Sequence, residues 1–190
     1  ELTEVWPTNG GDGDFGQTDA VATTPDGETV YFYDKDSGHL GAYDVSDGSF
    51  EDRGAVAGDP GGVVLAAFSP DGTLWAASQD TDELYTVDVT SPSLTSRGET
   101  GIDLMGADIA LAADGSLFIW TSSGADEGLY RVSDPTTDAT AVPVDASNVG
   151  SIPESITGLA VRDAGTGAVA ASERENDEIA RFHESVPPEC

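Results

Sequence analysis

One pattern occurs four times along this chain of 190 residues: a run of small residues, an Asp-Gly turn, a β-rich run, a polar turn and a second β-rich run. The equivalent turns lie at Asp26-Gly27, Asp71-Gly72, Asp114-Gly115 and Asp163-Ala164-Gly165, at intervals of roughly 45 residues. A repeat of this length with about four strands is typical of one blade of a β-propeller. The sequence therefore predicts an all-β fold and, because one repeat cannot bury its own faces, a single domain over residues 1–190.

Each repeat predicts a blade of four antiparallel strands. Runs of Ala, Gly, Val, Leu and Ile suit the innermost strands, and the β-rich runs after each turn suit the second and third strands. The fourth repeat has no outer strand of its own. We expect residues 2–6, LTEVW, to complete the last blade and close the ring, which removes an exposed sheet edge. The predicted blades are about residues 19–57, 62–100, 107–145 and 155–185 plus 2–6.

The SPDG turn at residues 69–72 and the LYTVD strand at residues 84–88 resemble β-propellers of the YVTN and NHL-like type. This resemblance implies the fold and leaves the activity open, because such propellers serve as enzymes, adhesins and scaffolds. Propellers of these families commonly have six or seven blades. Four repeats leave three options: a closed four-blade ring as in hemopexin-like domains, a half-ring that dimerises into eight blades, or a fragment of a longer propeller. The matching ends favour the closed ring and a monomer, with a dimer as the alternative.

The charge of the chain limits its partners. Seven Lys and Arg against 36 Asp and Glu give a formal net charge of −29, and the acids occur in every repeat. A field this negative repels phosphate backbones and anionic lipids, which argues against nucleic-acid binding and membrane insertion. The expected partners are cations, basic proteins, or neutral ligands such as glycans.

The spread of acids also resembles proteins of salt-loving organisms. At molar salt the Debye length falls to about 3 Å, so the self-repulsion of such a chain is largely screened. No apolar run approaches the roughly 18 residues needed to span a bilayer. We expect a secreted or cell-surface protein of a halophile, whose signal peptide is not part of this sequence. Cys190 is the only cysteine, so no disulfide forms within the chain.

Two carboxylates are candidates for a cation site on the propeller axis. Aligning the inner strands places Asp19, Val64, Asp108 and Thr157 at one level. Asp19 and Asp108 belong to the first and third blades, so they would face each other across a four-blade channel. Together they would bind Ca²⁺, Mg²⁺ or Na⁺, or one of them would stay protonated. The resemblance to four-blade propellers also implies an axial ion; the alternative is that both residues cap strands at a solvated rim.

Two acidic segments resemble calcium loops. Residues 10–19 carry acids at alternating positions, Asp12 and Asp14 among them, but lack the Glu at position twelve of an EF-hand. The alternative for this segment is a flexible acidic connector. The D-x-D-x-G stretch at residues 34–38 corresponds to ordinary polar turns in the other repeats, so we interpret it as a hairpin turn.

The residues needed for catalysis are scarce. His39 and His183 are the only histidines, and they form no H-x-x-x-H or H-x-H pair, which argues against a zinc centre. The chain has no G-x-S-x-G motif and no recognisable Ser-His-Asp set. His183 is the candidate general base of a lyase, since propeller lyases and lactonases use a His or a metal near the axis. The Trp and Tyr residues fall on strands, where packing between blades is the expected role and glycan binding the alternative.

These observations favour a non-catalytic module for recognition, adhesion or assembly. Its protein or glycan partner would bind the connections from outer to inner strands, because these converge on one face and vary most between repeats. These connections are residues 7–19, 57–63, 101–107 and 145–155. The alternatives are a metal-dependent lyase or lactonase, which predicts at least three convergent ligands at the channel mouth, and a fragment of a larger propeller protein.

Overall fold

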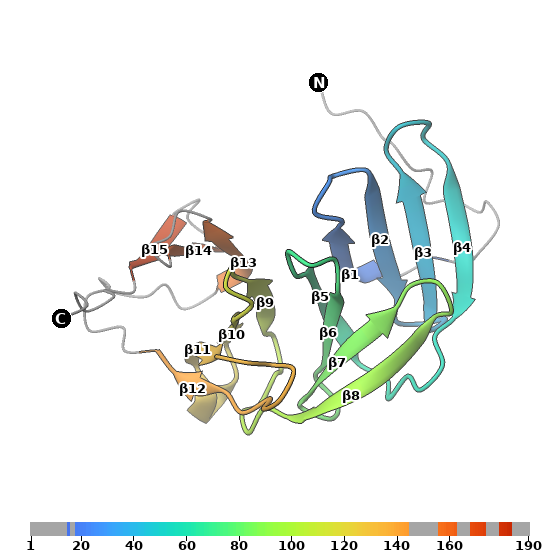
Figure 1. The fold of residues 1–190 in the computed structure, drawn as a ribbon. Helices are drawn as coiled ribbons and strands as arrows, with labels where there is room; N and C mark the ends of the chain where they lie inside the picture. The colour runs from blue at the N-terminus through green and yellow to red at the C-terminus, as the bar shows by residue number, and fades with distance from the viewer. Residues whose placement is uncertain (1–14, 16–17, 145–155, 163–167, 174–178, 184–190) are drawn as a thin grey trace.

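The computed structural model describes residue 15 and residues 18–144, 156–162, 168–173 and 179–183. Its strands form four antiparallel sheets, and within each sheet the strands follow one another in chain order (Figure 1). Three sheets have four strands, and three strands of the fourth sheet are described. The predicted all-β fold built from four-stranded antiparallel blades is confirmed. Residues 2–6, predicted to complete the last blade, lie outside the described residues.

The first sheet holds β1 (Thr18–Thr23), β2 (Thr29–Asp34), β3 (His39–Asp44) and β4 (Phe50–Ala55). The second holds β5 (Val63–Phe68), β6 (Leu74–Ser78), β7 (Glu83–Asp88) and β8 (Ser93–Glu99). The third holds β9 (Asp108–Leu111), β10 (Leu117–Thr121), β11 (Gly128–Val132) and β12 (Val142–Pro143). The fourth holds β13 (Ile156–Arg162), β14 (Ala168–Glu173) and β15 (Ile179–His183).

The Asp-Gly turns that mark the repeats join the first and second strands of the sheets. In the second sheet the Asp71 carboxylate accepts hydrogen bonds from the Ser69 hydroxyl and, at 3.0 Å, from the Thr73 amide. These bonds lower the pKa of Asp71, the Ser69 hydroxyl having the largest effect. Gly72 follows with a φ of 86°, a conformation that glycine adopts without steric cost. The turn chemistry thus explains why Asp-Gly recurs once per repeat.

The four sheets follow one another in an arc (Figure 1). Inner strand β1 packs on β5, β5 packs on β9, and β9 packs on β13. The sheet β13–β15 and the sheet β1–β4 lie at opposite ends of the arc (Figure 1). Between β10 and β11 a single 3-10 turn, η1 (Gly124–Asp126), is the only helix among the described residues. No helix in this part of the chain is long and apolar enough to cross a membrane.

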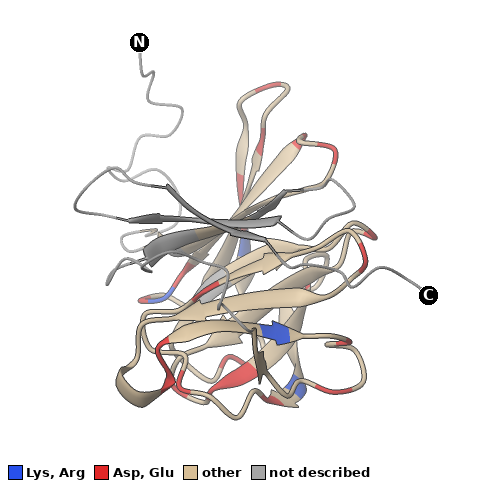
Figure 2. Ribbon diagram, turned by 90° about the vertical axis from the view of Figure 1, so that its left-hand side faces the viewer, with Lys and Arg blue, Asp and Glu red and all other residues tan. Residues whose placement is uncertain are grey.

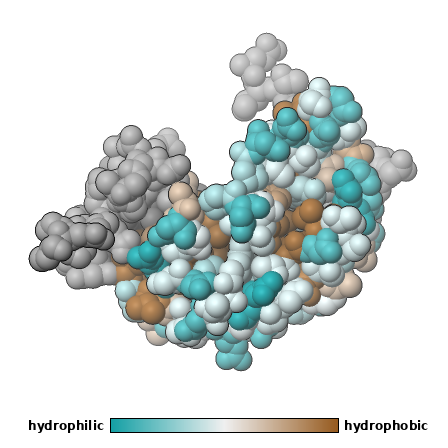
Figure 3. All heavy atoms as spheres, in the orientation of Figure 1, coloured by the Kyte–Doolittle hydropathy of each residue, from teal (hydrophilic) through white to brown (hydrophobic). Residues whose placement is uncertain are grey.

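The hydrophobic core lies between neighbouring sheets. One cluster joins the first and second sheets through residues such as Tyr33, Leu40 and Tyr85, and Figure 3 shows hydrophobic atoms in the recess there. A second cluster joins the second and third sheets, and Leu84 and Leu117 in it are fully buried. The second sheet therefore contributes to two cores, one on each face, as a blade inside a propeller does.

Leu117 tests how much a core between sheets contributes to stability. Leu117→Ala removes a fully buried side chain, so we expect it to lower the free energy of unfolding by about 2–5 kcal/mol, from lost burial and a residual cavity. The control Val142→Ala changes a side chain that is 58% exposed, and we expect a change within about 0.5 kcal/mol. Guanidinium denaturation of both variants measures the difference. Equal stabilities would show that this cluster is not the core.

Candidate functional site

Two of the predicted binding connections lie beside hairpin turns at one end of the sheets. In the second sheet the Ser78 hydroxyl donates to the Gly61 carbonyl at 2.8 Å, and the Gln79 amide donates to the Gly62 carbonyl at 3.0 Å. In the third sheet the Thr121 hydroxyl donates to the Asp103 carbonyl at 2.7 Å. We call this surface the loop end; it comprises residues 57–62, 79–82, 101–107 and 122–127. The predicted binding connection at 145–155 and most of that at 7–19 lie outside the described residues.

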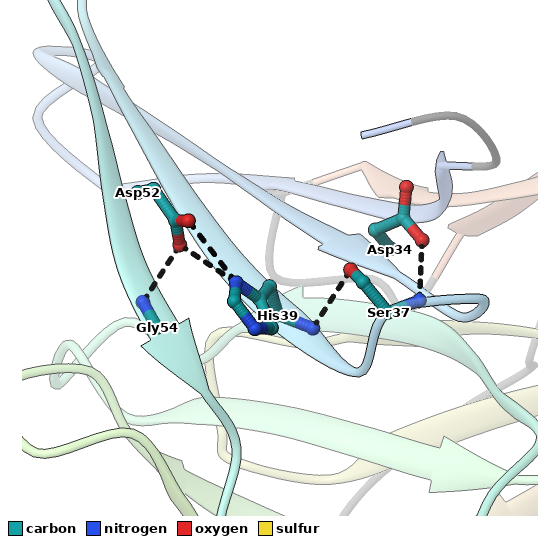
Figure 4. Close-up of polar contacts among 5 residues, drawn as sticks. All are labelled: Asp34, Ser37, His39, Asp52 and Gly54. Carbon is teal, nitrogen blue, oxygen red and sulfur yellow. Dashed lines mark hydrogen bonds and ion pairs between the residues drawn. The ribbon is translucent and has the colours of Figure 1, made fainter. Parts of the chain in front are cut away.

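In the first three sheets, the last residue of the second strand binds nearby backbone groups. Ser78 and Thr121 are fully buried, and their hydroxyls bind the incoming connections. Asp34 occupies the same place in β2 and is also fully buried. Its carboxylate accepts the Asp36 amide proton at 2.9 Å and the Ser37 amide proton at 3.0 Å, and Figure 4 shows the bond to Ser37. The D-x-D-x-G stretch is thus a hairpin turn capped by Asp34, as interpreted from the sequence.

Asp82 locks the second sheet to the connection that leads into the third. Among the described residues it is the only non-glycine with a positive φ, at 55°. Its carboxylate accepts the Leu104 amide proton at 2.9 Å, and its carbonyl accepts the Thr100 amide proton at 2.9 Å. Gly38 holds the corresponding turn position in the first sheet, with a φ of 68°. Asp82 therefore keeps a conformation that glycine adopts more easily, and its carboxylate adds a bond to the connection that leads into the third sheet.

The connection 101–107 is also fixed to the 3-10 turn η1. The Asp103 amide donates to the Asp126 carboxylate at 3.0 Å, and the Ser123 hydroxyl donates to the Asp103 carboxylate. The Ser123 hydroxyl is also the main reason that the pKa of Asp103 is lowered. The Asp103 carboxylate further accepts the amide proton of Met105, whose side chain is 55% exposed. This rigid loop presents a large apolar side chain to solvent.

Met105 was missed in the sequence analysis. The chain has a single methionine, and its position in a connection otherwise made of small or acidic residues and buried Ile and Leu was the available signal. Methionine is unbranched and polarizable, so it adapts to differently shaped partners. Gly101 and Gly106 flank the segment that carries Met105, with φ values of 79° and 66° that favour glycine.

The loop end is strongly acidic. Its four segments contain Asp59, Asp80, Asp82, Asp103, Asp126 and Glu127 and no Lys or Arg. On the described strands, Arg53 pairs with Glu51 and Arg131 pairs with Asp114, both at 3.1 Å. Figure 2 shows acidic residues distributed over the described loops and strands, with few basic ones among them. The field at the loop end therefore favours cationic or neutral partners.

A tyrosine ties the connection 57–62 to the first sheet. The Tyr33 hydroxyl donates to the Asp59 carboxylate at 2.5 Å, and burial together with that carboxylate raises the pKa of Tyr33. The other Asp59 oxygen accepts the Gly61 amide proton at 2.9 Å. A Cβ added at Gly62 would lie 2.5–2.8 Å from the Asp80 carboxyl group, so another residue there would require the Asp80 side chain to move. The φ of 61° at Gly62 also favours glycine.

The residues predicted for the axial cation do not share one level. Asp108 pairs with Trp120 of β10, and the equivalent pair in the first sheet is Ala20 with Tyr33. Asp108 therefore corresponds to Ala20. Asp19 falls one residue earlier, at the register shift between Thr18 and Ala20. The predicted alignment is thus offset by one residue, because the sequence does not reveal the bulge. Asp12 and Asp14 lie outside the described residues.

The Asp108 carboxylate joins the third and fourth sheets. One oxygen accepts the Leu159 amide proton at 2.6 Å, and the other accepts the Ile109 amide proton at 2.9 Å. Burial raises the pKa of Asp108, and these two bonds partly oppose the rise. In the part of the chain that the structure describes, no three His, Cys, Asp or Glu side chains come together as a metal-binding group.

His39 pairs with a carboxylate on the neighbouring strand. His39 Nδ1 lies 3.0 and 3.1 Å from the two Asp52 oxygens, linking β3 to β4 (Figure 4). Asp52 also accepts the Gly54 amide proton at 2.7 Å. Ser37 uses its hydroxyl to accept the His39 amide proton, so this Ser-His-Asp group is not arranged as a catalytic triad. His183 is in β15, and nothing is described of its side chain.

The fold is that of a β-propeller. The structure is similar to a virginiamycin B lyase from Staphylococcus aureus, with a TM-score of 0.56 and 13% identity, covering 88% of this chain and 55% of that chain. A catalytically inactive histidine-to-alanine variant of that lyase with quinupristin gives a TM-score of 0.54, 14% identity and the same coverage.

The hydrazine synthase of Kuenenia stuttgartiensis gives a TM-score of 0.54 at 17% identity, covering 90% of this chain and 50% of that chain. No family model and no curated protein sequence matches the chain. At these identities the likeness shows the fold alone. The chain spans about half the length of the solved structures that it resembles.

Variants of Asp82 test whether a hydrogen bond from the second sheet holds the connection 101–107 of the loop end. Asp82→Ala removes the bond to the Leu104 amide and leaves an unfavourable φ, so we expect a loss of about 1–3 kcal/mol of stability and faster hydrogen exchange at the Leu104 amide. Asp82→Asn keeps an acceptor oxygen and tolerates the φ, and we expect a loss below about 1 kcal/mol. Denaturation and amide exchange by NMR measure both effects. Wild-type exchange at Leu104 in Asp82→Ala would contradict the assignment.

Proposed function

We propose that this chain is a non-catalytic propeller module that binds a partner through its loop end. The observation that carries the proposal is the construction of that surface. Hydrogen bonds from Ser78, Thr121 and Asp82 hold its connections, while Met105 remains exposed among carboxylates. A rigid surface binds with little loss of conformational entropy. An apolar side chain within an acidic rim suits a partner that offers both a hydrophobic contact and positive or neutral polar groups.

The partner is a basic protein segment or a neutral glycan, and the role is recognition, adhesion or assembly. The net charge of −29 supports this choice, because it repels anionic ligands over the whole surface. The same charge supports a high-salt environment, because molar salt screens its self-repulsion. A secreted or cell-surface location is part of the proposal. The likeness to virginiamycin B lyase is not evidence for lyase chemistry, since 13% identity carries only the fold.

Met105 provides the test of this function. We expect the chain to bind members of an array of basic peptides and neutral glycans in molar KCl, and Met105→Ser to weaken that binding at least tenfold by removing the apolar contact. The matched control Val142→Ser changes a side chain of similar exposure on β12, outside the segments of the loop end, and retains wild-type affinity. Binding that Met105→Ser leaves unchanged, or no binding on the array, would refute the proposal.

We also propose that a cation, Ca²⁺ first among the candidates, binds near the axis with Asp19 and Asp108 as ligands, and that Asp12 and Asp14 form a second acidic site. The support is the presence of both residues at the starts of inner strands and the hard oxygen ligands that Ca²⁺ requires.

Calcium titration tests the axial cation. We expect millimolar Ca²⁺ to raise the melting temperature of the wild type and to have no effect on the Asp19→Asn, Asp108→Asn double variant. The comparison uses the Ca²⁺-dependent change alone, because Asp108→Asn also disturbs the bonds to Leu159 and Ile109. Asp88→Asn, an exposed carboxylate in β7, serves as the control for general charge effects. A wild type that does not respond to Ca²⁺ would exclude this cation.

A further inference from the structure

The first sheet has an apolar face that points away from the second sheet. Its inward face, with Tyr33 and Leu40, belongs to the core shared with the second sheet. Side chains alternate between the faces of a strand, so the intervening residues form the opposite face. We call this surface the outer face of the first sheet; its apolar residues are Val21, Val30, Phe32, Tyr43 and Phe50. The same register places Gly41, His39 and Asp52 on this face as well.

The outer face of the first sheet is built like the faces that join sheets elsewhere in this chain. Strand pairing gives each of its residues a counterpart in the second sheet, where the same positions pack against the first sheet. Val21 pairs with Phe32 as Ala66 pairs with Ala76, and Val30 pairs with Tyr43 as Leu74 pairs with Val87. Phe50 corresponds in the same way to Leu94. The counterparts Ala66, Ala76, Val87 and Leu94 all belong to the core between the first two sheets.

The third sheet repeats this arrangement. Ile109 pairs with Ile119, and Leu117 pairs with Val132, at the same positions of the repeat. All four are buried against the second sheet. Three successive sheets thus present apolar residues at equivalent positions, and in two of them these positions form the contact with the preceding sheet.

In the first sheet these positions are not fully covered. Val21 is 51% exposed, whereas its counterpart Ile109 in the third sheet is 3% exposed. Phe15 covers part of the face: its ring contacts the Phe50 ring edge-on at 5.0 Å, beside Gly41. A Cβ on Gly41 would lie 2.6 Å from the Phe50 ring, so glycine allows this aromatic pair to pack against the strand. The rest of the face has the same apolar composition as the contacts between neighbouring sheets.

We propose that the outer face of the first sheet is covered by a second copy of this chain, which continues the arc toward a ring. Two observations favour this occupant. The solved propellers similar to this chain are nearly twice as long as the part it matches, since 88% of this chain covers 55% of the lyase. The arc also begins with a sheet whose outer face follows the inter-sheet pattern, so its natural neighbour is another sheet of the same kind. Two copies related by a two-fold axis would form this contact twice.

The assembly depends on salt. Each chain carries a formal charge of −29, so two copies repel each other strongly in dilute buffer. Molar salt shortens the Debye length to about 3 Å and screens this repulsion, while the apolar contact persists. The dimer therefore forms at high ionic strength and dissociates at low ionic strength.

Light scattering coupled to size-exclusion chromatography of the 190-residue chain tests the proposal. In molar KCl the expected mass is twice 19.5 kDa. Val21→Asp puts a charge on the outer face and shifts the mass to that of one chain, or raises the dissociation constant at least tenfold. Val21 is half exposed in the single chain, so this variant keeps its fold, which circular dichroism checks. Val142→Asp, at 58% exposure on β12, is the matched control and stays dimeric.

Three outcomes would overturn the proposal. A wild type of 19.5 kDa at every salt and protein concentration shows that no second copy binds, whether the face is covered within the chain or by another partner. A Val21→Asp variant that dimerises like Val142→Asp places the interface elsewhere on the molecule. A dimer that is equally stable in dilute buffer and molar KCl contradicts the electrostatic argument. None of these results bears on binding at the loop end, because Met105 lies in the connection 101–107 and Val21 lies on the outer face of the first sheet.

Discussion

The burial of apolar residues between neighbouring sheets is the interaction on which the rest of this structure depends. The core clusters of the first three sheets lie between sheets: Leu84 of the second sheet and Leu117 of the third are fully buried because they lie between two sheets. Apolar area is buried only where two sheets pack together, so the hydrophobic stabilisation at each contact requires both sheets. A sheet at the end of the series keeps one apolar face that its own chain covers only in part, as Val21 shows.

Buried hydrogen bonds determine how one sheet follows the next. The Ser78 and Thr121 hydroxyls and the Asp82 carboxylate each satisfy a backbone group of a connection between sheets. An unpaired backbone group at these places would be costly, so the connections have little freedom once the sheets pack. The same bonds that order the fold also order the loop end, and this rigidity makes the surface suitable for recognition.

Charge acts on this molecule at two scales. Locally, carboxylates such as Asp71 and Asp103 accept hydrogen bonds in turns, which lowers their pKa values and keeps them ionised. Over the whole chain, the same carboxylates sum to a net charge of −29 with few cations to offset it. The short turns are thus stabilised by groups whose long-range repulsion has to be screened by salt.

The sequence by itself determined the repeat, the turns and the sheets, because Asp-Gly turn chemistry and β-rich alternation are local properties of the chain. It also indicated that the stretch at Asp34 is a hairpin turn. Only the tertiary structure decided the register of Asp19 relative to Asp108. A bulge of one residue shifts the register of β1, and the sequence does not indicate where that bulge lies. The exposure of Met105 and the backbone conformation of Asp82 also required the packed sheets, because both depend on contacts between residues far apart in the chain.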